Sequence, residues 1–395
     1  MITRVYKERY LNNTALKIIM ASSTISSIAN HNQCTHFPLL NLSEIAQTMI
    51  YSDHEMFFAK FLLPTLLVIG VIGNATFIYA VARIKRLHSI TNLYLVNLAV
   101  ADILFLLMAI PIYIASIISS PIRDTIPWES RFGCISVKAV AGSFYFTSLG
   151  LVSLVTLERY LAICHPFHHR GINTIKRTVK LVVVTWLIGI MLGLCLGFGD
   201  GQLVRYCLEW PDTFITFPTE VSMCKTARSD LILLEELSKT IPFIIALTGN
   251  TYMYFRIMRA LGGRNFHPEE KSEESTQSKF QSQANKVRNQ VARLLIVNGL
   301  IFFMSQTLAR VLSTNILLEQ TLDVRFLNSE IYSRALIISR LMLFMNSVVN
   351  PIVYNLTSSI YRQAFREAFC RRNHRHIKED GQSQNTYSMS VTRDN

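Results

Sequence analysis

Long uncharged apolar runs constrain the fold of this chain more than any other feature of its sequence. Five of them approach or exceed the roughly 18–20 residues with which an α-helix crosses the hydrocarbon core of a bilayer. They are Phe61–Ala82, Ile103–Ile122, Ala139–Leu157, Leu181–Gly199 and Leu341–Tyr361. Two shorter runs, Thr240–Phe255 and Leu294–Ala309, have the length of buried soluble helices, but beside five clear spans we interpret them as spans with polar ends. The sequence therefore predicts an all-α membrane protein with seven transmembrane helices.

The composition agrees with this class. Half of the residues are hydrophobic and only 16% are charged, and the mean hydropathy is +0.29. Soluble globular proteins are ordinarily more polar. A large soluble helical protein would need amphipathic helices, and the apolar runs lack that pattern.

The distribution of positive charge along the chain predicts its orientation in the membrane. Arginine and lysine gather in the first, third and fifth connections and in the tail, beginning with Arg83, Lys85 and Arg86 in the first. By the positive-inside rule these segments are cytoplasmic and the N-terminus is extracellular. We expect an extracellular segment over 1–56, a membrane domain over 57–370, a cytoplasmic tail over 371–395, and a location in the plasma membrane. The net charge of +13 then reflects topology and contact with anionic lipids, not a nucleic-acid partner.

The N-terminal segment carries marks of an extracellular location. Met1–Asn30 has no continuous apolar core, so we expect the first span, not a cleavable leader, to target the chain. Two sequons, at Asn12 and Asn41, are candidate glycosylation sites.

The cysteines divide by side. Cys34, Cys134, Cys207 and Cys224 fall outside, where disulfides persist and where four cysteines allow three pairings. We favour Cys134–Cys207, which would tie the third span to the connection after the fourth, with Cys34–Cys224 as a candidate second bridge; a bond from Cys134 to Cys224 is the alternative. On the other side Cys370 follows an amphipathic stretch, Ser359–Phe369. This stretch predicts a short eighth helix at the membrane surface with palmitoylation at Cys370; a buried, unmodified thiol is the alternative.

The order and spacing of several motifs resembles the rhodopsin-like (class A) G-protein-coupled receptors over about 57–370. These motifs are Gly73-Asn74 in span one, Leu98–Asp102 in span two, Cys134 twenty-five residues before Arg159, Glu158-Arg159-Tyr160 after span three, Trp186 in span four, Pro242 in span five and Asn350-Pro351-Ile352-Val353-Tyr354 in span seven. The resemblance implies a seven-helix bundle, of the neuropeptide-receptor type, that binds an extracellular ligand and catalyses nucleotide exchange on a heterotrimeric G protein.

Two groups of site residues follow. Asp102 is a carboxylate within a span, which the bilayer allows only where polar partners face it inside the bundle. We expect those partners to be Asn74, Ser148, Asn346, Ser347 and Asn350. The resemblance implies water and a sodium ion beside Asp102, and no other cofactor; a static polar contact between helices is the alternative. The coupling and activation residues are expected to be Glu158, Arg159, Tyr160, Asn350, Pro351 and Tyr354, with Arg159 pairing Glu158 in the inactive form and Pro351 permitting a bend.

The sequence also departs from the family pattern. Gln306 stands where span six usually has a tryptophan, and Leu308 where it has a proline. Asn250 replaces the usual tyrosine of span five, and Arg288 stands where some members place an acid that locks Arg159. The family's trigger therefore does not transfer to this chain.

Charged residues in the upper bundle indicate the ligand. Ala141 takes the place of the carboxylate that amine receptors need, and Phe344 that of the lysine that retinal needs. We expect the pocket to be formed by Lys138, Glu235, Arg310 and Arg340, whose three basic groups suit a carboxylate, an amide carbonyl or an acidic side chain. The loop Tyr206–Pro211 resembles the hairpin of peptide receptors, so we favour a neuropeptide, with a lipid or other small anionic mediator as the alternative.

Other classes of function have less support. A seven-span transporter would show internal repeats, which we do not find. No nucleophile–base pair, phosphate loop or metal-ligand spacing points to an enzyme, and we interpret the cytoplasmic histidines, among them His165 and His169, as solvated. Serines and threonines in Gly262–Asn289 and Asn373–Asn395 are candidate sites for receptor kinases and then arrestin.

Overall fold

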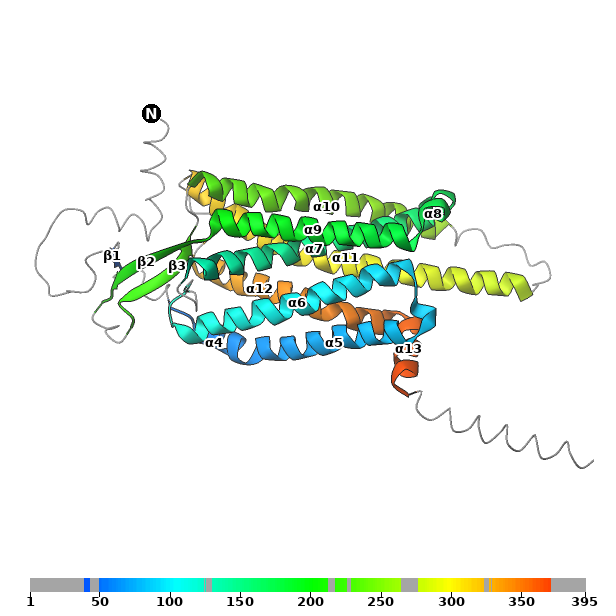
Figure 1. Ribbon diagram of the computed structural model, residues 1–395, viewed down its shortest axis with the longest axis horizontal. Helices are drawn as coiled ribbons and strands as arrows, with labels where there is room; N and C mark the ends of the chain where they lie inside the picture. The colour runs from blue at the N-terminus through cyan, green and yellow to red at the C-terminus, as the bar shows by residue number, and fades with distance from the viewer. Residues whose placement is uncertain are drawn as a thin grey trace, which may run out of the picture.

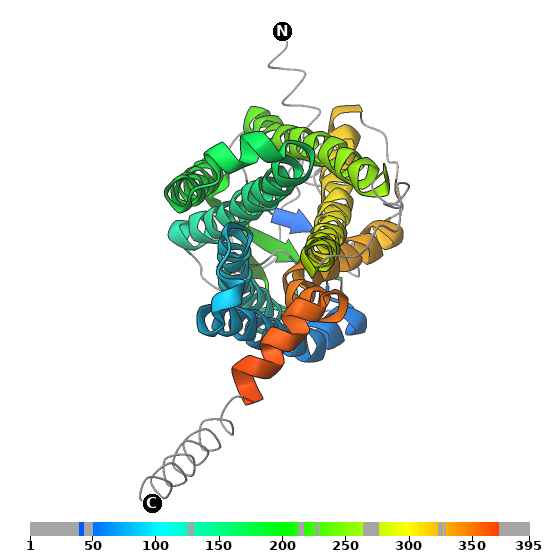
Figure 2. The same ribbon diagram turned by 90° about the vertical axis from the view of Figure 1, so that its right-hand side faces the viewer.

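The chain folds into a bundle of seven long helices with a small sheet at one end. The computed structural model describes residues 39–42, 50–123, 125, 130–211, 217–225, 229–263, 276–322, 327 and 329–370. The long helices are α5 (Leu63–Arg83), α6 (Ile90–Ser119), α7 (Arg131–Cys164), α9 (Ile175–Asp200), α10 (Ser229–Gly263), α11 (Thr276–Leu322) and α12 (Ser329–Thr357). They run side by side along the long axis (Figure 1) and form a ring when viewed along it (Figure 2). The predicted fold class is confirmed.

Six helical segments in the described parts of the chain are long and apolar enough to cross a membrane. The first, Asp53–Arg83, joins α4 (Asp53–Phe57), a π-helical turn (Phe58–Leu62) and α5. Among the seven long helices of the described residues, α10 is the one that is not apolar enough by this measure. Its first part carries Glu235, Glu236 and Lys239. This matches the short apolar run that the sequence shows there.

Side-chain caps explain where several helices begin. The hydroxyls of Ser89, Ser130 and Thr174 accept hydrogen bonds from the backbone N–H groups three residues on, at the starts of α6, α7 and α9. A hydroxyl in this position satisfies a backbone donor that has no partner within the helix. At the start of α4, Ser52 and Glu55 form a reciprocal capping box.

A row of glycines brings α9 against α7. Gly189, Gly193 and Gly197 are spaced four apart, so they lie on one face of α9. A Cβ on Gly193 would lie 2.3 Å from the backbone nitrogen of Ser143, and one on Gly197 would lie 2.6 Å from the carbonyl oxygen of Ile135. Small residues at this spacing are a known signal for close helix packing in membranes.

A three-stranded sheet lies across one end of the ring, which we call the sheet end (Figure 2). Strands β2 (Gln202–Glu209) and β3 (Glu220–Lys225) form an antiparallel hairpin. The N-terminal strand β1 (Leu39–Asn41) pairs parallel to β2, with Leu39 opposite Cys207. A small apolar core lies between these strands and the connection after α6, formed by Leu42, Ile122, Tyr206, Leu208, Val221 and Met223. The sequence predicted the hairpin but not the N-terminal strand.

Two short helices mark the opposite end of the bundle. Helix α8 (Pro166–Ile172) lies between α7 and α9, and α13 (Ser359–Cys370) follows α12. Helix α13 occupies the stretch for which the sequence predicts an amphipathic helix. Tyr361 and Ala364 are buried against the bundle, whereas Phe369 is 59% exposed. We call the end of the bundle at which α8 and α13 lie the α13 end.

Candidate functional site

A cavity of about 210 Å³ lies inside the bundle and is lined mainly by residues of α7, α10, α11 and α12. Its charged lining residues are Lys138, Glu235, Lys239 and Arg310, and its aromatic ones are Phe105, Phe144, Tyr145 and Phe302. The remaining polar residues that line it are Ser148, Gln306, Asn346 and Ser347. The structure thus brings together three of the four side chains expected to form a pocket.

The charges beside the cavity form one close ion pair and two more distant ones. Lys239 forms an ion pair with Glu235, and the Lys138 ammonium lies 4.0 Å from the same carboxylate. The Arg310 guanidinium lies 4.0 Å from Glu236 and 5.2 Å from the centre of the Tyr145 ring. The Nε and Nη1 atoms of Arg310 are buried without a hydrogen-bond acceptor among the described residues. A buried donor without an acceptor lowers stability, so Arg310 is suited to bind a hydrogen-bond acceptor of a ligand.

The fourth expected residue, Arg340, lies apart from this group. Its guanidinium donates a hydrogen bond of 2.9 Å to the hydroxyl of Tyr113 and stacks over that ring at 4.9 Å. It is not among the described residues that line the cavity. The sequence predicts Arg340 in the upper part of the bundle, near the expected pocket. In the structure its side chain instead contacts Tyr113 of α6.

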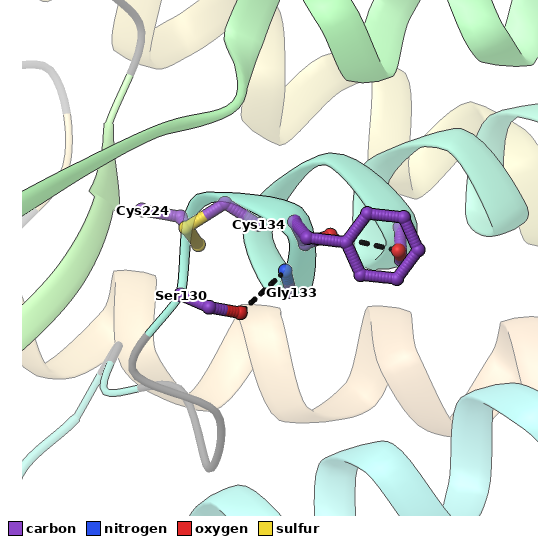
Figure 3. Close-up of a disulfide and its surroundings, with 6 residues drawn as sticks. Ser130, Gly133, Cys134 and Cys224 are labelled. Atoms are coloured by element: carbon purple, nitrogen blue, oxygen red, sulfur yellow. Dashed lines mark hydrogen bonds between the residues drawn. A yellow bond between two sulfur atoms is a disulfide. The ribbon is translucent and has the colours of Figure 1, made fainter.

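The disulfide that joins the sheet to the bundle differs from the predicted one. Cys134, at the start of α7, is bonded to Cys224 of β3 (Figure 3). The predictions of Cys134–Cys207 and Cys34–Cys224 are therefore wrong; Cys207 takes part in a separate disulfide.

The register of the hairpin explains the difference. Cys224 lies one pair from the base of the hairpin, opposite Leu203, and its neighbour Met223 bridges to Thr125 in the connection before α7. Cys207 lies farther out, opposite Glu220. Sequence spacing could not distinguish these two positions.

A polar cluster lies in the middle of the bundle. The amide of Asn350 donates a 2.6 Å hydrogen bond to Asp102, and Ser347 also hydrogen-bonds this carboxylate. Asn74 donates to the carbonyl oxygens of Ser347 and Gly70, at 2.8 and 2.9 Å. These helices, α5, α6 and α12, are therefore tied together around one buried carboxylate.

The other two residues expected in this cluster, Ser148 and Asn346, line the cavity. Among the described residues, no group of three or more His, Cys, Asp or Glu side chains lies together as a metal site. Asp102 and the Ser347 hydroxyl are oxygen ligands of the kind that a hard cation such as sodium accepts. The donor set therefore fits such an ion.

At the α13 end, Glu158 is held by three partners. Its carboxylate lies 3.0 Å from Nε of Arg159, accepts a 3.0 Å hydrogen bond from the Thr91 hydroxyl, and lies 3.3 Å from Nε2 of His169. Glu158 and Arg159 thus form an ion pair in this structure. The interpretation of His169 as a solvated side chain is wrong, because its side chain is only 16% exposed. The side chain of Arg288 lies outside the described residues.

Aromatic residues connect α12 to α13. The Tyr354 ring is packed between Phe77 and Tyr361, with centroids 5.0 and 5.7 Å apart. The Tyr361 hydroxyl donates a 2.6 Å hydrogen bond to the side-chain oxygen of Asn92. Burial raises the pKa of Tyr361 to about 12, so it stays a neutral donor at neutral pH.

Helix α10 contacts α7 through two hydrogen bonds at this end. Asn250 donates to the Ser153 hydroxyl at 3.0 Å, and the hydroxyls of Tyr254 and Thr156 are 3.1 Å apart. Tyr254 is also packed against Gly299 of α11. Tyr254, which links these helices, thus lies one turn beyond Asn250, the position at which the family usually has a tyrosine.

Comparison with known proteins agrees with this arrangement. Residues 73–354 match the family model described as 7 transmembrane receptor (rhodopsin family). The chain is 25% identical to a thyrotropin-releasing hormone receptor of Gallus gallus, over 87% of this chain and 86% of that protein. It is 25% identical to a neuromedin U receptor homologue of Caenorhabditis elegans, over 86% of both chains, and 24% identical to an allatostatin-A receptor of Bombyx mori, over 76% of both.

Proposed function

Because this chain belongs to the rhodopsin family of seven-transmembrane receptors, we propose that it binds an extracellular neuropeptide and activates a heterotrimeric G protein. The relatives with matches along most of their length are named as receptors for thyrotropin-releasing hormone, neuromedin U and allatostatin-A. The chain is then a multi-pass protein of the plasma membrane, with the sheet end outside and the α13 end in the cytoplasm.

The observation that carries this proposal is the cavity beneath the sheet. Charged residues from α7, α10 and α11 line its mouth, and apolar and neutral polar residues line its depth. A concave site with a few polar groups among aromatic side chains is typical of ligand sites. The strands above it offer further contact area to a ligand larger than the cavity.

Signal transfer would run from the cavity to the cytoplasmic end through the polar cluster. Ser347 lines the cavity and also hydrogen-bonds Asp102, so a ligand that shifts α12 disturbs both. Asn350 and Pro351 lie one turn farther along α12, where the missing backbone donor of proline permits bending. We propose that this bend releases Tyr354 and separates Arg159 from Glu158, which exposes Arg159 to the G protein.

Several further sites belong to the same proposal. We assign a sodium ion to Asp102, palmitate to Cys370 at the end of α13, and glycans to Asn12 and Asn41. Receptor kinases and arrestin would act on the third cytoplasmic connection and the tail, while anionic lipids would contact the basic residues of the cytoplasmic surface. The placement of Asn12 and of the tail falls outside the described residues.

A lipid or other small anionic mediator is the second candidate. The loosely paired Arg310 suits a carboxylate head group, and a cavity of this size holds a small ligand.

A reporter experiment separates the candidates. Cells that express the chain, with calcium and cyclic-AMP reporters, are tested against a neuropeptide library and a lipid-mediator library. We expect a peptide response that Arg159→Ala abolishes at equal surface expression. A response to lipids alone would transfer the assignment to the second candidate, and signalling unchanged by Arg159→Ala would refute the role of that arginine.

A further inference from the structure

The side chain of Tyr254 joins three helices in the half of the bundle nearer the α13 end. It belongs to α10, it is 7% exposed, and its hydroxyl lies 3.1 Å from the hydroxyl of Thr156 on α7. The Thr156 hydroxyl has one proton and donates it to the carbonyl oxygen of Val152 at 2.9 Å, so Tyr254 is the donor between the two hydroxyls. On its other side, the Tyr254 ring packs against Gly299 of α11.

The ring of Tyr254 occupies a space that is open only because Gly299 has no side chain. A Cβ there would lie 1.7 Å from the Tyr254 hydroxyl oxygen and 2.7 Å from the ring carbon that carries it. Leu295 and Phe303 lie four residues away on either side, on the same face of α11, and both are large and buried. Because the interior is closely packed, α11 cannot slide or rotate to bring either side chain to this position while Tyr254 stays in place.

Helix α10 is attached to α7 at two points that are one turn apart. Asn250 donates a 3.0 Å hydrogen bond to the hydroxyl of Ser153, and one turn farther along both helices Tyr254 meets Thr156. Gly299 has no side chain to form such a bond, so α11 is held against Tyr254 by packing alone. We therefore expect α10 and α7 to move together, and α11 to move relative to them.

This contact lies close to Arg159, which the proposed function assigns to the G protein. Thr156 precedes Arg159 by three residues on α7, about 4.5 Å along the helix axis. The Arg159 side chain is 15% exposed and is paired with Glu158. Leu295 of α11 and Leu95 of α6 line one narrow gap with Thr156, so the three helices converge beside this turn. A displacement of α11 at Gly299 therefore opens the bundle next to Arg159.

We propose that Tyr254 is a positioning residue that holds α11 against α7, and that Arg159 becomes accessible only after Tyr254 leaves the space beside Gly299. While Tyr254 donates to Thr156, its ring blocks the movement of α11; once this hydrogen bond breaks, the ring can rotate away. Closely packed interfaces switch between discrete arrangements. The hydrogen bond thus favours the arrangement seen here, which we call closed, over one in which α11 has moved, which we call open. The inference rests on the proposed coupling to a G protein and adds a residue that controls it.

Three substitutions weaken the contact in different ways. Thr156→Val keeps the shape of the side chain but removes the acceptor, Tyr254→Phe removes the donor, and Gly299→Ala displaces the ring. We expect each to raise basal G-protein signalling at equal surface expression. The first two should raise it about two- to tenfold, because one hydrogen bond favours the closed arrangement by a factor of that size. Since both remove the same bond, their combination should signal no more than the stronger single variant.

Two control substitutions on α10 make similar changes away from the contact. Thr248→Val removes an exposed hydroxyl that donates to backbone carbonyl oxygens of its own helix. Gly249→Ala adds a methyl group where no atom lies within 4 Å. Neither should change basal signalling.

A distance measurement tests the contact without a G protein or a ligand. Cys164, Cys195 and Cys370 are replaced by serine, and paramagnetic labels are attached through Ile175→Cys at the start of α9 and Arg293→Cys on α11. Both labelled positions are exposed. Pulsed electron paramagnetic resonance on the purified receptor should give one dominant distance in the parent. A second, longer distance should gain population in each of the three variants.

Unchanged label distances in all three variants would overturn the inference. Basal signalling that stays at the parent level, in a receptor that responds to a peptide of the library, would do so as well. A lower unfolding midpoint without either change would assign Tyr254 to packing alone. If the labels separate but no reporter responds, the role of Tyr254 in the bundle is supported and the proposed coupling to a G protein fails.

Discussion

Replacement of Gly299 by alanine tests the packing between α10 and α11 at the α13 end. A Cβ on Gly299 would lie 1.7 Å from the hydroxyl oxygen of Tyr254 and 2.7 Å from the ring carbon that carries it. Tyr254 is only 7% exposed and its hydroxyl is hydrogen-bonded to that of Thr156, so it has little room to move. We therefore expect Gly299→Ala to displace the Tyr254 ring and break this hydrogen bond.

The expected loss of stability has two parts. Overpacking of a filled interior costs about 1–3 kcal/mol. The lost hydrogen bond adds about 0.5–1.5 kcal/mol. The thermal unfolding midpoint of the purified receptor should therefore fall clearly. Gly249→Ala is the matched control, because a Cβ there would meet no atom within 4 Å and alanine favours a helix over glycine.

A double-mutant cycle checks that Tyr254 is the cause. Tyr254→Phe removes the oxygen that lies nearest to the new methyl group, so Gly299→Ala should cost less in that background. The difference between the two backgrounds measures the coupling. If the two substitutions add to within about 0.5 kcal/mol, the alanine acts elsewhere and the reasoning fails.

Three further changes have expected outcomes. Cys134→Ser and Cys224→Ser should each lower the free energy of unfolding by about 2–4 kcal/mol, and the double variant should lower it no further. Peptide mapping without reduction should recover Cys134 and Cys224 in one disulfide-linked peptide. A linked peptide that contains Cys134 and Cys207 would contradict this. His169→Ala should raise basal G-protein signalling at equal surface expression, because Glu158 then loses a partner that helps to hold Arg159; unchanged basal signalling would contradict that role. Gly193→Val should lower the unfolding midpoint, because its Cβ would lie 2.3 Å from backbone of α7, and a receptor as stable as the parent would show that α9 can move away.

The seven helices could be predicted from the sequence because the thickness of the bilayer sets the length of an apolar run. The residues at which the helices begin and end could not be predicted in this way. Helix α11 extends from Thr276 to Leu322, far beyond the apolar run Leu294–Ala309, because polar residues can continue a helix beyond the membrane boundary. Hydropathy reports where the membrane lies, not where the helix begins.

Contacts that depend on strand register were beyond the sequence. The correct partner of Cys134 follows from which residues of β2 and β3 face each other, and one hairpin offers two cysteines. The strand β1 consists of three residues in a segment that carries no pattern of its own, and its pairing with β2 becomes visible only in the structure. Likewise, His169 meets Glu158 because α8 folds back beside α7.

One departure from the family pattern that the sequence shows, Gln306, lies at the cavity in the structure. Gln306 lines the cavity beside Ser347, which hydrogen-bonds Asp102, and Asn350 donates to the same carboxylate. A ligand in this cavity would lie next to α12, the helix that carries Asn350 and Pro351. We therefore expect the route from ligand to cytoplasm to run through α12 in this chain, where α11 lacks the usual tryptophan and proline. If this is correct, Asn350→Ala should uncouple ligand binding from signalling more strongly than any substitution at Leu308.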